Sequence, residues 1–228
     1  MRARESVRSL WWLIHKDLTR EIRAQNAWPG MLLLGLVLVF LLATQINLPL
    51  EQKTRTVGGL LWLSIFFAGT LALERSFANE RDTGCWQALN LYPVDSSLLF
   101  LAKMVVNIVS LVILEIVLIP AFIVLTDVPL LARPGPLLMI AALGSICFAS
   151  LGTLLSALTA GLRFRGGMLA LLLLPLVTPV VLAAAEATRI VLAGEVDPQL
   201  WQWIRLLAVF AAVFTIAGAL LFEFVMEE

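Results

Sequence analysis

The residues able to carry out chemistry are few, and they form no recognisable catalytic or metal-binding arrangement. Cys85 and Cys147 are far apart and lack the CxxC spacing of a metal site and the CxxCH spacing of covalent haem attachment. The three lysines follow His, Gln and Ala rather than the glycine of a nucleotide-binding P-loop. No nucleophile stands beside a base at a characteristic spacing. We therefore expect no catalytic residue, no metal site and no ATP hydrolysis by this chain alone.

Two polar residues, Asn107 and Glu115, stand inside an apolar run. Lys103, Asn107 and Glu115 are separated by multiples of four residues, which places them on one face of a helix. Ionisable groups inside a membrane cost ~2.5–3.5 kcal/mol or more when unpaired and are functional candidates by default. Asn107 and Glu115 are therefore candidates for an intramembrane function. The alternative, which we favour for Glu115, is a protonated carboxyl or one that is paired with a neighbouring helix.

The composition is that of a membrane protein. Of the 228 residues, 61% are hydrophobic and only 14% are charged, and the mean hydropathy is +0.96, far above that of soluble domains. Apolar runs that match a hydrocarbon core of about 30 Å cover residues 31–48, 57–75, 98–125, 136–161, 167–187 and 204–224. The remaining segments are short. We predict an all-α membrane protein with six transmembrane helices that form a single domain over residues 1–228.

Charge distribution predicts the orientation. Of the 16 lysines and arginines, eleven lie before the first run or between the second and third or the fourth and fifth runs, and five lie in the other connections. The positive-inside rule then places both termini in the cytoplasm, for a multi-pass protein of the inner (cytoplasmic) membrane. The first 30 residues lack the apolar run of a signal peptide.

The N-terminal segment, residues 1–27, has an amphipathic pattern. Apolar residues recur at steps of three and four, with basic residues on the other face; the apolar positions are Val7, Trp11, Ile14, Leu18 and Ile22. This pattern predicts an interfacial helix in the headgroup layer. The alternative is a helix that packs on the bundle outside the membrane.

Two predicted spans have special compositions. The fourth has small residues at every fourth position, which favours close helix or subunit contacts over a smooth wall for a translocated apolar substrate; these are Ala141, Ser145, Ala149, Thr153, Ala157 and Gly161. The fifth contains Pro175 and Pro179, which remove backbone donors one turn apart. These prolines are hinge candidates, and a static kink is the alternative.

A charged segment separates the second and third apolar runs. Residues 76–92 combine charges with aromatic and aliphatic residues at helical spacing before Pro93, and Asp95 or Ser96 can cap the following helix. We predict a short cytoplasmic helix, held at both ends, that transmits force; the alternative is a solvated loop. The candidate contact residues are Glu80, Arg81, Asp82, Trp86, Leu89 and Tyr92.

Two stretches carry a family resemblance. Residues 74–103, from "ERSFANERDTG" to "LFLAK", are similar to the coupling-helix region of exporter-type ABC permeases. Residues 161–188, "GLRFRGGMLALLLLPLVTPVVLAAAEAT", resemble the signature of CcmB, the haem-exporter permease subunit of cytochrome c maturation, with Phe164 as an extra residue. The resemblance assigns the cytoplasmic turn of this signature to Arg163, Arg165, Gly166 and Gly167.

The resemblance implies a non-catalytic, permease-like subunit that works beside a separate ABC ATPase, CcmA, which binds the ATP. It also implies membrane partners similar to CcmC and CcmD and a haem chaperone similar to CcmE. ATP hydrolysis would be coupled to release of the haem-loaded chaperone. A second copy of the chain is a further expected partner, and nucleic acid is not.

Haem is an expected substrate rather than a bound cofactor. Haem iron needs an axial ligand, but the sole histidine, His15, lies in the predicted interfacial helix on the cytoplasmic side. Met139, Cys147 and Tyr92 are of types that can bind haem iron, but none of them is favoured as a ligand. Two rival functions stay open: the permease of a drug, lipid or polysaccharide ABC exporter, and a non-transporting membrane scaffold for the haem-delivery complex.

Overall fold

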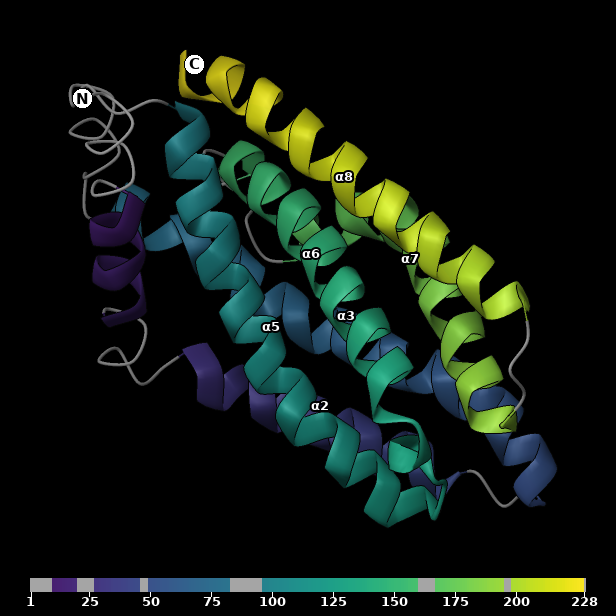
Figure 1. The fold of residues 1–228 in the computed structure, drawn as a ribbon. Helices are drawn as coiled ribbons and strands as arrows, with labels where there is room; N and C mark the ends of the chain where they lie inside the picture. Colours follow the sequence, from purple (N-terminus) through teal and green to yellow (C-terminus); the bar gives the residue numbers. More distant parts are fainter. Residues whose placement is uncertain are drawn as a thin grey trace.

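The computed structural model describes residues 10–19, 27–45, 49–82, 96–159, 167–194 and 198–227, and all regular elements within these ranges are helical. A helix over residues 10–19 comes first. The elements that follow are α2 (Ala27–Thr44), α3 (Leu50–Asp82), α5 (Ser96–Thr126), the short 3₁₀ helix η1 (Leu130–Ala132), α6 (Pro134–Thr159), α7 (Met168–Ala193) and α8 (Pro198–Glu227) (Figure 1).

The helices correspond to the six predicted apolar runs. Five contain segments long and apolar enough to cross a membrane, namely Gln52–Glu74, Ser96–Thr126, Pro134–Thr159, Met168–Ala193 and Pro198–Val225. The apolar part of α2, Trp28–Thr44, is shorter than these. The 18 residues of α2 still extend about 27 Å, close to the thickness of a hydrocarbon core. The prediction of an all-α membrane protein is confirmed, with α2 as its shortest apolar helix.

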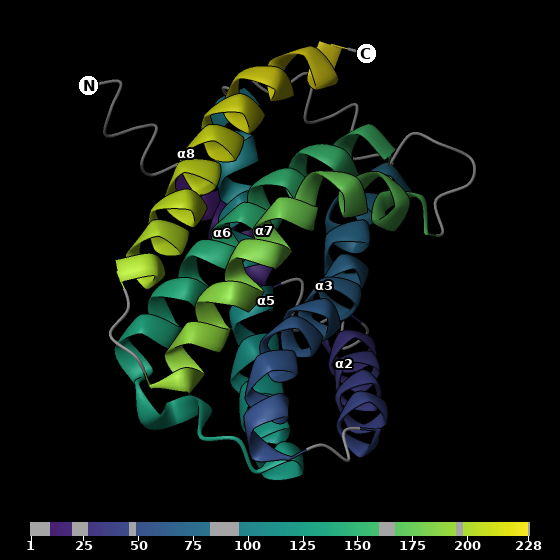
Figure 2. The same cartoon turned by 90° about the vertical axis from the view of Figure 1, so that its right-hand side faces the viewer.

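Helix α6 lies at the centre of the bundle. It packs against α3, α5, α7 and α8, whereas α2 packs on α3 and α5 at one side (Figures 1 and 2). We call the end where α3 finishes the Asp82 end; α6 and α8 also finish there, and α5 and α7 begin there. The opposite end, where α3 begins, is the Leu50 end. This arrangement brings the ends of these five helices together at the Asp82 end (Figure 1).

Small residues allow α6 to occupy this central position. Its predicted stripe from Ala141 to Ala157 is buried inside the chain, while Gly161 lies outside the described residues. A Cβ atom at Gly144 would lie 2.3 Å from the Trp62 ring, and one at Gly152 would lie 2.4 Å from Leu73. Both contacts come from α3. Gly144 and Gly152 directly precede the stripe residues Ser145 and Thr153, so α6 makes close contacts with α3 next to its buried stripe.

Candidate functional site

Helix α3 extends beyond the predicted apolar run and includes the first part of the predicted coupling segment. The second apolar run was expected to end at residue 75, but the helix continues without a break to Asp82. Its 33 residues extend roughly 50 Å, so α3 exceeds the hydrocarbon thickness by several turns. Residues 76–82 thus continue α3 rather than starting a separate helix. This makes α3 a rigid extension from the bundle core to the start of the connecting segment, residues 83–95.

Six residues were predicted to contact a partner from this region. Glu80, Arg81 and Asp82 occupy the last turn of α3, and their side chains are outside the described part of the chain. Trp86, Leu89 and Tyr92 fall in the connecting segment, which also lies outside the described residues. The role of these six residues therefore stays a prediction. The structure describes the two helices that flank the connecting segment, α3 and α5.

The ammonium group of Lys103, in α5, contacts both the N-terminal helix and α3. Its Nζ atom lies 3.0 Å from Asp17 Oδ2 of the helix over residues 10–19 and donates a hydrogen bond of 3.1 Å to the backbone oxygen of Ser76 in α3. It also lies 5.2 Å from the centre of the Phe77 ring. We call Asp17, Ser76, Phe77 and Lys103 the Lys103 cluster. The cluster links the N-terminal helix, α3 and α5.

The Asp17–Lys103 pair is withdrawn from solvent. Each side chain is only 6% exposed. Asp17 Oδ2 lacks hydrogen-bond geometry despite the short distance, so the contact is an ion pair rather than an aligned hydrogen bond. Lys16 approaches the other carboxylate oxygen at 3.3 Å and is about half exposed. Because Lys103 is the more buried of the two cations, removing it leaves Asp17 with a partner that water screens.

Aromatic rings extend this cluster to α8. The Phe77 and Phe222 ring centres are 5.8 Å apart, and those of Phe100 and Phe222 are 5.7 Å apart. All three side chains are fully buried. Gly218 leaves room for Phe100, because a Cβ atom there would lie 2.4 Å from the ring. The end of α8 is therefore packed against the same turn of α3 that Lys103 contacts.

A further contact connects α3 to the start of α7. The backbone N–H of Gly167 donates to Glu74 Oε1 at 3.1 Å. Gly167 precedes α7 with φ of +78°, a conformation that favours glycine. A carboxylate at a helix N-terminus also interacts favourably with the helix dipole. Of the predicted turn, only Gly167 is described; Arg163, Arg165 and Gly166 lie outside the described residues.

The intramembrane candidates Asn107 and Glu115 lie on the contact between α5 and α6. Asn107 Nδ2 donates to Thr153 Oγ1 at 2.8 Å, and Ser145 Oγ donates to Glu115 Oε1 at 2.9 Å. All four side chains are buried. Together with Lys103, these residues form a polar seam along α5. The two partners on α6, Thr153 and Ser145, both belong to its small-residue stripe. The stripe therefore provides hydrogen bonds to α5.

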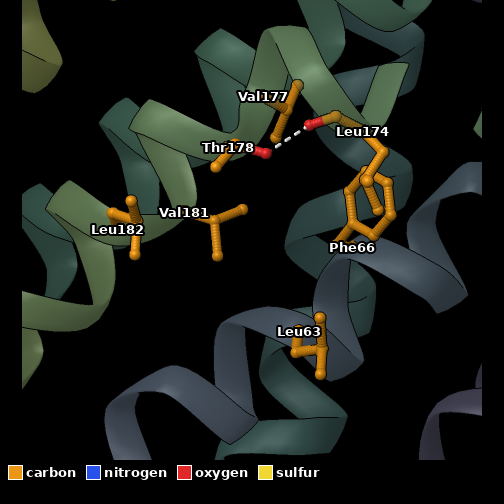
Figure 3. Close-up of a pocket in the computed structure, with 7 residues that line it drawn as sticks. All are labelled: Leu63, Phe66, Leu174, Val177, Thr178, Val181 and Leu182. Carbon is orange, nitrogen blue, oxygen red and sulfur yellow. Dashed lines mark hydrogen bonds between the residues drawn. The ribbon is translucent and has the colours of Figure 1, made fainter. Parts of the chain in front are cut away.

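The two prolines of α7 each follow in sequence a residue that lines an apolar hollow, Leu174 and Thr178, but neither proline lines it. Pro175 and Pro179 are both inside the continuous helix Met168–Ala193. The hollow has a volume of about 190 Å³ and separates α7 from α3 (Figure 3); its lining residues are Leu63, Phe66, Leu174, Val177, Thr178, Val181 and Leu182. The Thr178 hydroxyl already donates to the Leu174 backbone oxygen at 2.6 Å. The hollow therefore offers an apolar surface, and the hinge stays a prediction.

The haem-ligand types are spread over the described residues. No group of three or more His, Cys, Asp or Glu residues within the described ranges is arranged to hold a metal ion. Cys147 is buried and directs its thiol to the Leu207 backbone oxygen at 3.6 Å, and Met139 is exposed on α6. His15 interacts with Thr19 within its own helix. Tyr92 lies outside the described residues.

Three residues of this region were not predicted as site residues. Asp17, Phe77 and Glu74 gain their importance from partners 86, 145 and 93 residues away in the chain, respectively. Asp17 did leave one signal, because it is an acidic residue between Lys16 and Arg20 on a basic segment. Glu74 stood at the end of the second apolar run and Phe77 in the predicted coupling segment, and neither position indicated its distant partner.

These features define a helical membrane protein whose described contacts gather where α3 and α5 flank residues 83–95. The family model described as CcmB protein matches residues 8–226. The chain belongs to the CcmB family, which confirms the resemblance found in its sequence.

Three curated relatives agree with this assignment, each named Heme exporter protein B. The protein from Rhodobacter capsulatus is 30% identical over 179 residues, which cover 78% of this chain and 81% of the relative. The one from Pseudomonas aeruginosa is 31% identical over 169 residues, covering 73% and 75%. The one from Paracoccus denitrificans is 30% identical over 190 residues, covering 82% and 84%.

Proposed function

We propose that this chain is the membrane subunit of a haem-export ABC system in cytochrome c maturation. The family match over residues 8–226 and the relatives named Heme exporter protein B support this function. The chain is a non-catalytic permease subunit, and a separate CcmA-like ATPase hydrolyses ATP. CcmC-like and CcmD-like proteins, a CcmE-like chaperone and a second copy are its partners. It resides in the inner membrane with both termini in the cytoplasm.

The observation that carries the mechanism is the unbroken course of α3 from the bundle core to Asp82. A long helix transmits displacement along its axis because its backbone hydrogen bonds make it stiff. The ATPase engages residues 80–92, and the movement passes through α3 to the elements packed on its last turns. In this mechanism the coupled output is release of the haem-loaded chaperone.

The first experiment tests ATPase docking. The double variant Asp82→Ala and Trp86→Ala should abolish co-purification of the ATPase subunit from membranes, while the chain remains inserted. Glu223→Ala is a matched control, because Glu223 is an exposed acidic residue on the last turns of α8 at the same end. Normal co-purification with the double variant would contradict docking through residues 80–92.

A second experiment tests the biological output. Membranes from cells that lack the chain are stained for covalent haem, and both c-type cytochromes and the haem chaperone are scored. We expect loss of the cytochromes with loaded chaperone still present, which places the chain at the energised release step. Loss of both would indicate haem supply instead, and normal cytochromes would indicate a general exporter.

The α3–α7 hollow is smaller than a typical small-molecule site. Its volume of about 190 Å³ is below the range of roughly 300–1,000 Å³ that small-molecule sites occupy. A pure scaffold and a coupled subunit differ in whether cytochrome maturation requires ATP hydrolysis by the partner. A scaffold should support cytochrome maturation with a hydrolysis-deficient ATPase, whereas a coupled subunit should not.

A further inference from the structure

We propose that Asp17 and Lys103 are positioning residues for energy coupling. Their ion pair makes the N-terminal helix, the Asp82 end of α3 and the start of α5 move as one unit when the ATPase engages the chain. This inference rests on the proposed function and adds to it a specific transmission element. It also gives the helix over residues 10–19 a role in coupling in addition to its predicted membrane contact.

The position of Lys103 in the chain is the first argument. Helix α3 enters the connecting segment at Asp82, and α5 leaves it at Ser96. Lys103 in α5 donates to the backbone oxygen of Ser76 in α3, so this bond closes the loop between the two helices. A force on the connecting segment acts on both helices, and the Lys103–Ser76 hydrogen bond opposes their separation.

The chemistry of the pair is the second argument. Replacing a buried ion pair by apolar side chains is often neutral or stabilising, so packing alone does not require charges here. A charged pair instead fixes which residues face each other, because a displaced partner leaves the other charge buried and unpaired. Asp17 thereby holds the N-terminal helix against the same Lys103 ammonium group that donates to Ser76 of α3.

The test compares Lys103→Met with Lys16→Met in the complex with the ATPase subunit. Both variants remove a cation near Asp17, but Lys16 is about half exposed and lies on the same helix as Asp17, so it cannot join that helix to α3. We expect normal ATPase co-purification with both variants. Lys103→Met should lower the yield of c-type cytochromes about tenfold, within the range of typical coupling energies, and Lys16→Met should leave it unchanged.

A distance measurement separates coupling from stability. Spin labels replace Trp12 and Leu158, which are 65% and 45% exposed, in a chain whose two native cysteines are changed to alanine. We expect ATP binding to change the distance between the labels in the parent chain and in Lys16→Met, but not in Lys103→Met. Lys103→Arg, which keeps the charge, should restore the change.

Two outcomes would overturn the inference. One is an unaltered distance change and cytochrome yield in Lys103→Met. The other is full recovery of the distance change and the cytochrome yield in the double variant Asp17→Asn and Lys103→Met. This double variant removes the unpaired charge without restoring the ion pair. Recovery would therefore make the pair purely structural. If the Asp82→Ala and Trp86→Ala double variant retains ATPase binding, the proposed docking through residues 80–92 fails, and this inference fails with it. If only the Lys103 variants behave normally, the proposed function stands.

Discussion

Helices α3 and α7 are held together differently at their two ends. At the Leu50 end, a Cβ atom at Gly58 would lie 2.7 Å from the Ala185 backbone oxygen, and buried Trp62 donates to Thr188 Oγ1 at 3.0 Å. At the Asp82 end, an exposed hydrogen bond runs from the Gly167 N–H to Glu74. The apolar hollow lies between these ends (Figure 3).

The two kinds of contact respond differently to movement. Close packing loses about a quarter to a half of its dispersion attraction when a gap of about 0.5–1 Å opens. An exposed hydrogen bond has a net value of only about 0.5–1.5 kcal/mol, because water replaces the lost partner. We therefore expect the Leu50 end to act as a fixed pivot and the Asp82 end to carry the movement. The predictions below test this difference.

The largest effect is expected at Trp62. Its side chain is 2% exposed, stacks on Phe148 with ring centres 6.2 Å apart and donates to Thr188. Trp62→Ala should destabilise the chain by about 3–5 kcal/mol, because it removes a large buried side chain and an interhelical bond. Thermal unfolding in detergent measures this. Trp201→Ala is the control at a 51% exposed site, and equal losses for both variants would contradict the pivot.

The next prediction concerns two neighbouring glycines of α3. Gly58→Ala forces a Cβ atom against backbone, which cannot rotate away, and should cost about 1–3 kcal/mol through overpacking. Gly59 has nothing within 4 Å of an added Cβ atom. Gly59→Ala should therefore be neutral, or stabilising by up to about 1 kcal/mol through helix propensity. Equal melting temperatures for the two variants would show that the Leu50 end is looser than its packing indicates.

The sequence predicted the helices better than it predicted their contacts. Apolar run length follows from membrane thickness and is readable locally, and the small residues of α6 directly indicate close packing. The end of α3 was misplaced because Glu74 and Arg75 ended the apolar run, although no Gly or Pro occurs until Gly84. The Asp17–Lys103 pair joins residues 86 positions apart, and helical periodicity carries no information about such partners.

A third prediction decides between a hinge and a static kink in α7. Replacing both Pro175 and Pro179 by alanine restores two backbone donors and should leave the chain at least as stable, because interior proline disfavours a helix by about 3 kcal/mol. If α7 bends there during coupling, the cytochrome yield should fall about tenfold. Pro198→Ala, at the start of α8, is the control. An unchanged yield with the stable double variant would favour the static kink.

The smallest effect is expected at Glu74 and separates charge from hydrogen bonding. Glu74→Gln keeps an oxygen that can accept from Gly167 but removes the carboxylate charge, whose interaction with the α7 dipole is worth about 0.3–1 kcal/mol. Glu74→Ala loses both and should be less stable. Because the contact is exposed, the difference in melting temperature between the parent chain and Glu74→Gln should shrink in high salt. If Glu74→Ala melts like the parent chain, this bond does not hold the Asp82 end, and the contrast between the two ends rests on the Leu50 packing alone.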